Sequence, residues 1–129
     1  MGIFPAVFTA VLLFLFPVIA FAQNKDAADS FAKVNGEKIW FQIKGAGEPV
    51  VLIPGGPGST HEIFLPWFNV LSRDFRVVYF DAFGRGKSSW AKNTEEYSFH
   101  RDVDDLEGLR PALGFNKWSV VSRFLAGTR

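Results

Sequence analysis

The stretch that decides the fold is VVLIPGGPGST, residues 50–60. Its first four residues form an unbroken apolar run before a glycine-rich loop, which is typical of a strand buried on both faces of a parallel sheet. The pattern returns in FRVVYFD, residues 75–81, where a second apolar run ends at an aspartate. A third run, residues 118–121, predicts another buried strand. Together these runs predict the centre of a parallel sheet.

Helical spacing fills the gaps between these strands. Apolar residues predict a helix over residues 63–71, in which Pro66 must lie early or kink the helix. A second helix is predicted over residues 98–113, with Gly114 as its C-terminal stop.

A β-hairpin is predicted upstream of the first buried strand. Asn35 and Gly36 both tolerate the positive φ of a tight turn, and they join the alternating segments 30–34 and 37–44. The fold class is therefore α/β, with a mostly parallel sheet made of an N-terminal hairpin plus three parallel strands with helices. Ligands of such sheets bind beyond the carboxyl ends of the strands, where both glycine-rich loops lie.

The first 22 residues are expected to be a targeting segment and not part of this fold. They contain no charged side chain, and they end in AFA at 20–22, the small-x-small pattern that a signal peptidase reads. A cleaved signal peptide predicts a secreted or periplasmic protein. An uncleaved membrane anchor through residues 3–22 is the alternative, because about 20 apolar residues cross a bilayer; a buried core helix is a third. Residues 23–30 are interpreted as a polar linker.

Composition excludes several classes of protein. The 129 residues include 14 Lys or Arg, 13 Asp or Glu and no Cys, for a net charge of +1. Such a balance creates no basic field, so nucleic acid is not an expected partner. An apolar content of 48% argues against a disordered chain. Without cysteine the fold depends on its core and not on disulfides.

The loop PGGPG, residues 54–58, is the first candidate for chemistry. Glycines allow backbone N–H groups to approach a ligand closely, because no Cβ intervenes. Such N–H groups stabilise negative charge that develops on an oxygen, which is the role of an oxyanion hole. A tight turn that only needs positive φ explains the same glycines, and the spacing does not choose between the two.

The second loop, DAFGRGKS at 81–88, fits no phosphate-binding fingerprint. A P-loop requires glycine where Asp81 stands, and a dinucleotide fingerprint starting at Gly84 requires glycine where Ser89 stands. We interpret the loop as structural, with Asp81 accepting backbone N–H bonds and with Gly84 and Gly86 allowing the turns.

The two histidines and the acidic cluster are interpreted as structural or solvated. His61 stands beside the glycine loop, where it is placed to face a site, but we interpret it as a polar residue at a helix start. His100 lies in a charged run and is expected to be solvated. With 39 residues between them and no Cys, they do not make a metal site, and neither a metal nor a cofactor is expected. A wet helix face accounts for the acidic residues Asp102, Asp104, Asp105 and Glu107.

Residues 50–89 together with DLEGLRPALGFNKWSVV, residues 105–121, resemble the N-terminal half of an α/β-hydrolase. More narrowly, they are similar to the proline iminopeptidase-like branch, whose hallmark is His-Gly-Gly-Pro-Gly after the third strand. The resemblance covers about residues 31–121, which we assign to the N-terminal part of such a domain. It implies a small peptide or small-molecule substrate for the full-length family.

The resemblance also assigns roles to single residues. It implies that Gly55 and Gly56 supply an oxyanion-hole N–H, with Gly56 the better candidate, and that residues 81–88 form the family's structural loop. Two positions depart from the branch. Pro54 replaces the leading His, so any hydrogen bond from that His to the loop is missing. The segment DAFG at 81–84 replaces the usual Asp-Gln-Arg-Gly and is closer to the general hydrolase pattern.

The catalytic triad of this fold is not found in the sequence. The strand at 118–121 should run into Gly-x-Ser-x-Gly, but Ser122 has Val120 and Phe124 where the glycines belong. The acid and the His follow the nucleophile in this fold, and neither His61 nor His100 stands in the expected place. We therefore expect a truncated hydrolase that is itself inactive, with residues 122–129 as a tail outside the family pattern.

Two other interpretations stay open. The chain is alternatively a non-catalytic binding or interaction module, or a member with another chemistry of the fold, such as epoxide or ester hydrolysis. The strand at 118–121 is expected to leave an open sheet edge, which predicts self-association.

Overall fold

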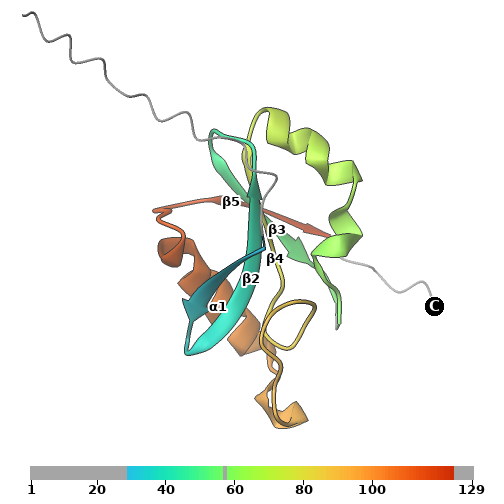
Figure 1. Cartoon of the computed structure of the whole chain (residues 1–129), viewed down its shortest axis with the longest axis vertical. Helices are drawn as coiled ribbons and strands as arrows, with labels where there is room; N and C mark the ends of the chain where they lie inside the picture. The colour runs from blue at the N-terminus through green and yellow to red at the C-terminus, as the bar shows by residue number, and fades with distance from the viewer. Residues whose placement is uncertain (1–28, 57, 124–129) are drawn as a thin grey trace, which may run out of the picture.

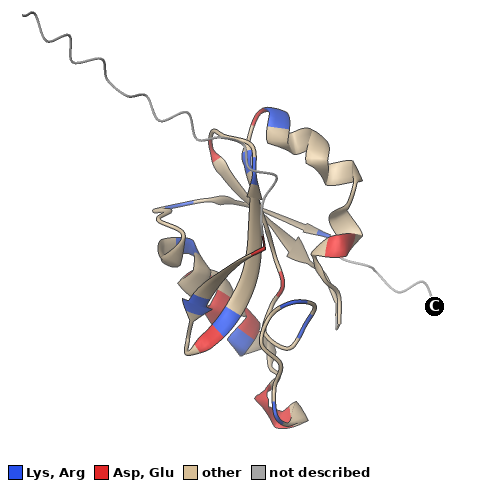
Figure 2. Cartoon of the chain, in the orientation of Figure 1, with Lys and Arg blue, Asp and Glu red and all other residues tan. Residues whose placement is uncertain are grey.

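The computed structural model describes residues 29–56 and 58–123. The predicted signal or anchor segment, all but the end of the linker, and the last six residues lie outside this part of the chain. Within it, no helix is long and apolar enough to span a membrane. Basic and acidic residues of the described part are interspersed, as Figure 2 shows.

The predicted hairpin is present as strands β1 (Ser30–Val34) and β2 (Glu37–Lys44), which pair antiparallel. Asn35 and Gly36 form the turn between them with φ values of 49° and 87°. Both values lie in the left-handed region that an Asn-Gly turn tolerates, so the prediction of this turn is confirmed.

The three predicted parallel strands are β3 (Pro49–Pro54), β4 (Arg76–Phe80) and β5 (Ser119–Arg123). The sheet has the order β1-β2-β4-β3-β5 (Figure 1). β3 pairs parallel with both β4 and β5, whereas β2 pairs antiparallel with β4. Because the three parallel strands point the same way, their carboxyl ends meet at one edge of the sheet.

The prediction that the third strand is buried is wrong. β5 lies at the edge of the sheet, and Val120 keeps 53% of its surface exposed. The side chain of Val120 points to the same side of the sheet as the helix α1 (Phe99–Ala112). This helix packs mainly against β1, at the opposite edge of the sheet, and therefore leaves Val120 uncovered. An apolar run shows that a segment is a strand, but its position in the sheet decides how much of it is covered.

The prediction of one helix over residues 63–71 is also corrected. The segment forms two short 3-10 helices, η1 (His61–Phe64) and η2 (Trp67–Arg73). Leu65 between them is extended, with φ −90° and ψ 144°. The residue before a proline is forced out of the helical region by the proline ring, which explains the break before Pro66. Trp67, the first residue of η2, is 77% exposed and lies outside the core.

The second predicted helix is α1, preceded by Ser98 and followed by Gly114. The Ser98 hydroxyl accepts a hydrogen bond from the backbone N–H of Arg101 at 3.1 Å, which caps the helix start. Gly114 has a φ of 80° and ends the helix as predicted. A further 3-10 turn, η3 (Thr94–Glu96), precedes the helix.

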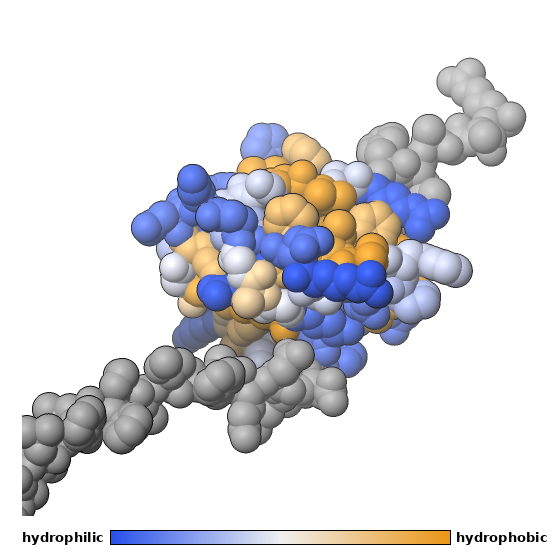
Figure 3. Space-filling view, turned by 90° about the horizontal axis from the view of Figure 1, so that it is seen from above, coloured by the Kyte–Doolittle hydropathy of each residue, from blue (hydrophilic) through white to orange (hydrophobic). Residues whose placement is uncertain are grey.

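The sheet carries an apolar layer on each face, because alternate residues of a strand point to opposite sides. On one face Val51 and Val78 join Leu109 of α1 in a buried cluster. On the other face Leu52 and Val77 pack with Phe64 of η1. Some apolar surface nevertheless stays exposed (Figure 3).

One member of the predicted wet acidic face is buried. Asp105 on α1 is 1% exposed, and its carboxylate accepts a hydrogen bond from the Asn35 side chain at 2.8 Å. Arg101 lies 3.7 Å from its other oxygen. Burial raises the pKa of Asp105, and the favourable contacts with Asn35 and Arg101 do not offset it. This carboxylate ties the helix to the hairpin turn, which no periodicity argument reveals.

Asp105→Asn tests this burial through the pH dependence of stability. In the unfolded chain an Asp side chain loses its proton near pH 4, whereas the folded protein holds this proton to higher pH. The free energy of unfolding is therefore expected to fall as pH rises above about 4, by at most about 1.4 kcal/mol per pH unit. The variant should lose this decline in urea titrations between pH 4 and 7.

Glu107→Gln, on the exposed side of the same helix and not among the groups that shift the pKa of Asp105, is the matched control and should keep the wild-type slope. An unchanged slope in the Asp105 variant would contradict the assignment.

Candidate functional site

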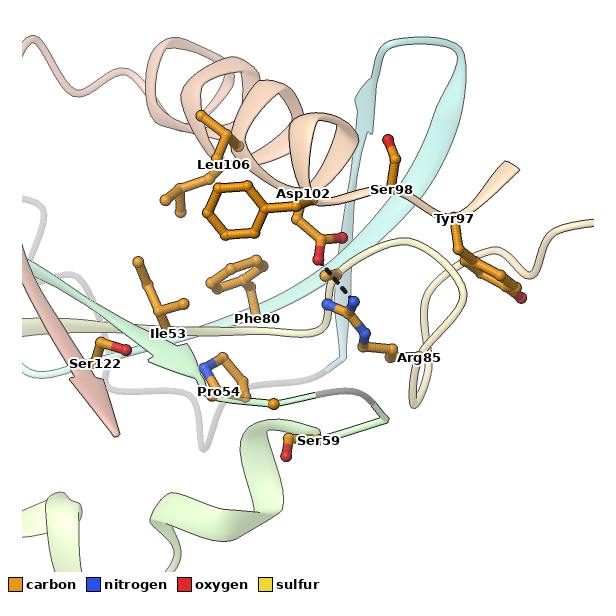
Figure 4. Close-up of a pocket in the computed structure, with 15 residues that line it drawn as sticks. Ile53, Pro54, Ser59, Phe80, Arg85, Tyr97, Ser98, Asp102, Leu106 and Ser122 are labelled. Carbon is orange, nitrogen blue, oxygen red and sulfur yellow. Dashed lines mark hydrogen bonds and ion pairs between the residues drawn. The ribbon is translucent and has the colours of Figure 1, made fainter. Parts of the chain in front are cut away.

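A cavity of about 570 Å³ opens at the carboxyl ends of the parallel strands (Figure 4). The sheet and α1 supply its mostly apolar walls, and the two glycine-rich loops contribute to its rim. The apolar lining comes from β3, β4 and α1 and includes Ile53, Phe80, Phe99, Val103 and Leu106.

The structure brings both predicted oxyanion glycines to this cavity. Gly55 is buried and Gly56 exposed, and both line it directly after β3 ends at Pro54. Gly56 has a φ of 87°, a conformation that side chains rarely adopt. Its carbonyl accepts a long backbone hydrogen bond from Ser59 at 3.4 Å. The backbone of Gly55 and Gly56 therefore forms part of the cavity wall. The role of their N–H groups as an oxyanion hole stays a prediction.

The loop at 81–88 is built around the carboxylate of Asp81, as predicted. Asp81 is fully buried and accepts the backbone N–H of Lys87 at 3.0 Å and that of His61 at 2.8 Å. Gly84 and Gly86 have φ values of 73° and 50°, which confirms that the turns of this loop use their conformational freedom.

His61 does start a helix, but it is not merely a polar residue at that start. Its ring is buried, and its Nδ1 lies 2.9 and 3.0 Å from the two carboxylate oxygens of Asp81. The ring also stacks against Trp40, with 4.1 Å between the ring centroids. Sequence reasoning missed this pair because 20 residues separate its members and no motif links them.

The pKa of Asp81 reflects two opposing effects. Burial alone raises it, but the hydrogen bonds from the His61 ring and from the backbone N–H groups of His61 and Lys87 outweigh burial, so the pKa lies below its usual value. Asp81 therefore stays ionised at neutral pH and holds three donors around one negative charge.

An ion pair crosses the rim of the cavity. Arg85, from the loop after β4, donates to Asp102 in the first turn of α1 at 2.7 Å (Figure 4). Both side chains are partly buried, with exposed fractions of 20% and 27%. Asp102 is thus a tie between loop and helix, and not simply part of a wet face. Because the charges of Arg85 and Asp102 offset each other, this pair adds no net charge to the rim of the cavity.

The remaining candidates do not form a triad in the described part of the chain. Ser122 lines the cavity from β5, away from the Arg85–Asp102 pair in Figure 4. Neither His61 nor His100 lines the cavity: the first is bound to Asp81, and the second is exposed on α1, as predicted. No group of three or more His, Cys, Asp or Glu residues suited to a metal occurs among residues 29–56 and 58–123.

Comparisons with known proteins agree with this geometry. Residues 48–121 match the family model described as the alpha/beta hydrolase fold. A proline iminopeptidase from Saccharolobus solfataricus is 28% identical over 96 residues, and one from Heyndrickxia coagulans is 33% identical over 96 residues. Each alignment covers 72% of this chain, but only 31% and 33% of the respective relatives.

A solved structure shares the arrangement of the elements. The epoxide hydrolase from Vigna radiata superposes with a TM-score of 0.70 at 25% identity, over 77% of this chain and 32% of that protein. The chain thus spans about a third of the length of the curated relatives that it matches. It belongs to the α/β-hydrolase-fold family, and over this N-terminal portion it is similar to the proline iminopeptidase branch.

Proposed function

We propose that this chain forms the oxyanion-loop part of a serine hydrolase that removes N-terminal residues from small peptides, in the manner of a proline iminopeptidase. The observation that carries this proposal is the position of Gly55 and Gly56 at the wall of an apolar cavity, at the carboxyl ends of parallel strands. The similarity to proline iminopeptidases supports the choice of substrate class.

The chemistry of acyl transfer fits such a wall. When a nucleophile attacks an amide carbonyl, the oxygen becomes negatively charged, and fixed N–H groups in an apolar setting stabilise that charge more strongly than water does. Apolar side chains such as Phe80 and Leu106 provide this setting next to the glycines. A small apolar residue such as proline is the matching occupant.

A chimera tests the role of Gly56. Residues 31–121 would replace the matching N-terminal third of the Heyndrickxia coagulans proline iminopeptidase, and hydrolysis of a prolyl anilide would be measured. The Cβ atom added by Gly56→Ala would have space, since its one close neighbour is Ser59 Oγ at 3.7 Å. The φ of 87° at this position is strained for any residue with a side chain, however, so we expect the backbone of the variant to rotate and to move the N–H group away from the cavity. Because the loss of one oxyanion donor slows catalysis about 100- to 1000-fold, kcat should fall by that order.

Gly58→Ala is the matched control for backbone strain. Gly58 has a φ of 76° and open space around it, and it does not line the cavity. This variant should keep kcat within a few-fold of the chimera. Equal losses in both variants would contradict a specific role for Gly56.

We infer that the described residues do not catalyse hydrolysis by themselves, because no histidine faces Ser122 across the cavity. A serine without a base has little reactivity near neutral pH. The full chain should therefore remain unlabelled by a fluorophosphonate probe under conditions in which the chimera is labelled. Labelling of Ser122, located by mass spectrometry, would contradict this inference.

Epoxide or ester hydrolysis is a second candidate chemistry. The superposition on the epoxide hydrolase from Vigna radiata favours it, since the shared arrangement includes the strands that border the cavity. A chimera that hydrolyses styrene oxide but no prolyl anilide would replace the peptidase proposal with this one.

An interaction module is a third candidate, favoured by the edge position of β5. Strand edges offer unpaired backbone groups to other chains unless charges or cover protect them. Val120 is 53% exposed there, and no charged residue lies between Lys117 and Arg123. We propose that two copies associate through this edge.

Val120→Lys tests that association, because a charge on an edge strand opposes pairing with another chain. In sedimentation velocity of the full chain, the variant should shift from dimer towards monomer. Val70→Lys, at an equally exposed valine of η2 that does not line the cavity, is the control and should leave the distribution unchanged. Monomeric wild-type protein would contradict the proposal.

A further inference from the structure

In its described residues, the glycine loop that faces the cavity is held mainly at its two ends. At its start, Pro54 is still part of β3 and lies opposite Arg123 of β5. Within the described part of the loop, the Ser59-to-Gly56 bond is long, at 3.4 Å, and both Gly56 and Gly58 have positive φ. A glycine-rich segment with little internal bonding depends on its anchors for a single conformation.

The anchor at the far end is His61. Its backbone N–H donates to Oδ1 of Asp81 at 2.8 Å, and its ring Nδ1 lies within 3.0 Å of both carboxylate oxygens. Asp81 in turn stands at the end of β4, the strand next to β3. The loop is therefore fixed at one end by β3 and at the other by the neighbouring strand.

The ring of His61 is itself held in place. Trp40 of β2 stacks on it at 4.1 Å between centroids, and the residue is only 6% exposed. A hydrogen bond to a carboxylate in such a setting is stronger than one that water competes for. Nδ1 is the ring nitrogen that faces the carboxylate of Asp81. A donor placed one atom farther along the side chain, at the position of Nε2, would not form this hydrogen bond.

We propose that His61 is the positioning residue of the oxyanion loop, and that its ring N–H to Asp81 fixes the Gly55–Gly56 backbone at the cavity. At the upstream end the loop is held by the strand pairing of β3, and at the downstream end His61 supplies the side-chain hydrogen bond. The significance of this anchor for catalysis rests on the proposed hydrolase function, but the anchoring itself is independent of it.

Two conservative variants separate the positioning role from a structural one. In His61→Asn the side-chain amide reaches the position of Nδ1, whereas in His61→Gln it reaches the position of Nε2. Both variants keep a polar amide at the same residue and lose the stacked ring. They differ in whether the donor meets Asp81, so a difference between them reports the hydrogen bond.

The readout is ¹⁵N relaxation of the backbone amides in the full ¹⁵N-labelled chain. In wild type and His61→Asn, the Gly55, Gly56 and Ser59 amides should have order parameters near about 0.85, and in His61→Gln they should fall below about 0.6. Amides of β4 and α1 should stay near the rigid value in all three. His100→Gln, at the exposed histidine of α1, is the control and should behave as wild type.

Equal order in the Asn and Gln variants would overturn the proposal, whether both loops stay rigid or both become mobile. If the Gln variant fails to fold while the Asn variant folds, the ring hydrogen bond serves the stability of the whole fold, and the positioning proposal is overturned. Because relaxation needs no turnover, loss of hydrolysis in the chimera with a rigid loop would instead count against the proposed function alone.

Discussion

The buried carboxylate of Asp81 is the interaction on which the rest of the site depends. One ionised side chain receives hydrogen bonds from the ring and the backbone of His61 and from the backbone of Lys87. These donors belong to two different loops, which follow neighbouring strands of the sheet. A buried charge without donors would be costly, and these hydrogen bonds together offset the effect of burial and hold the pKa of Asp81 below its usual value. The two loops are thereby tied to each other and to the end of β4.

A second tie extends this arrangement to the helix. Arg85, in the loop at 81–88, donates a hydrogen bond to Asp102 in the first turn of α1. This contact holds the loop to the helix that covers one side of the cavity. Asp105, one turn farther along, holds that helix to the hairpin turn through Asn35. The cavity walls are thus connected by three acidic side chains, and the apolar clusters fill the space between them.

Much of the fold follows from the sequence, because periodicity and turn chemistry are local. The Asn35-Gly36 turn, the apolar run of β3 and the Gly114 stop each depend on a few adjacent residues. The pairing of His61 with Asp81 and the burial of Asp105 depend on residues brought together only by the tertiary fold. Sequence patterns alone do not reveal such contacts. The apolar run at 118–121 likewise predicts burial, because such a run does not tell a central strand from an edge strand, whereas the open edge expected at this strand agrees with the exposure of Val120.

The order of the strands has a consequence for folding during synthesis. β3 lies between β4 and β5, so both of the strands with which it pairs are synthesised after it. Val50 pairs with Ser119, roughly 70 residues downstream. At about 5–20 residues per second, the ribosome needs about 4–14 s to make that stretch, during which one edge of this apolar strand has no native partner. The hairpin of β1 and β2, in contrast, is complete as soon as its own residues emerge, so the sheet grows from its N-terminal edge and closes around β3 last.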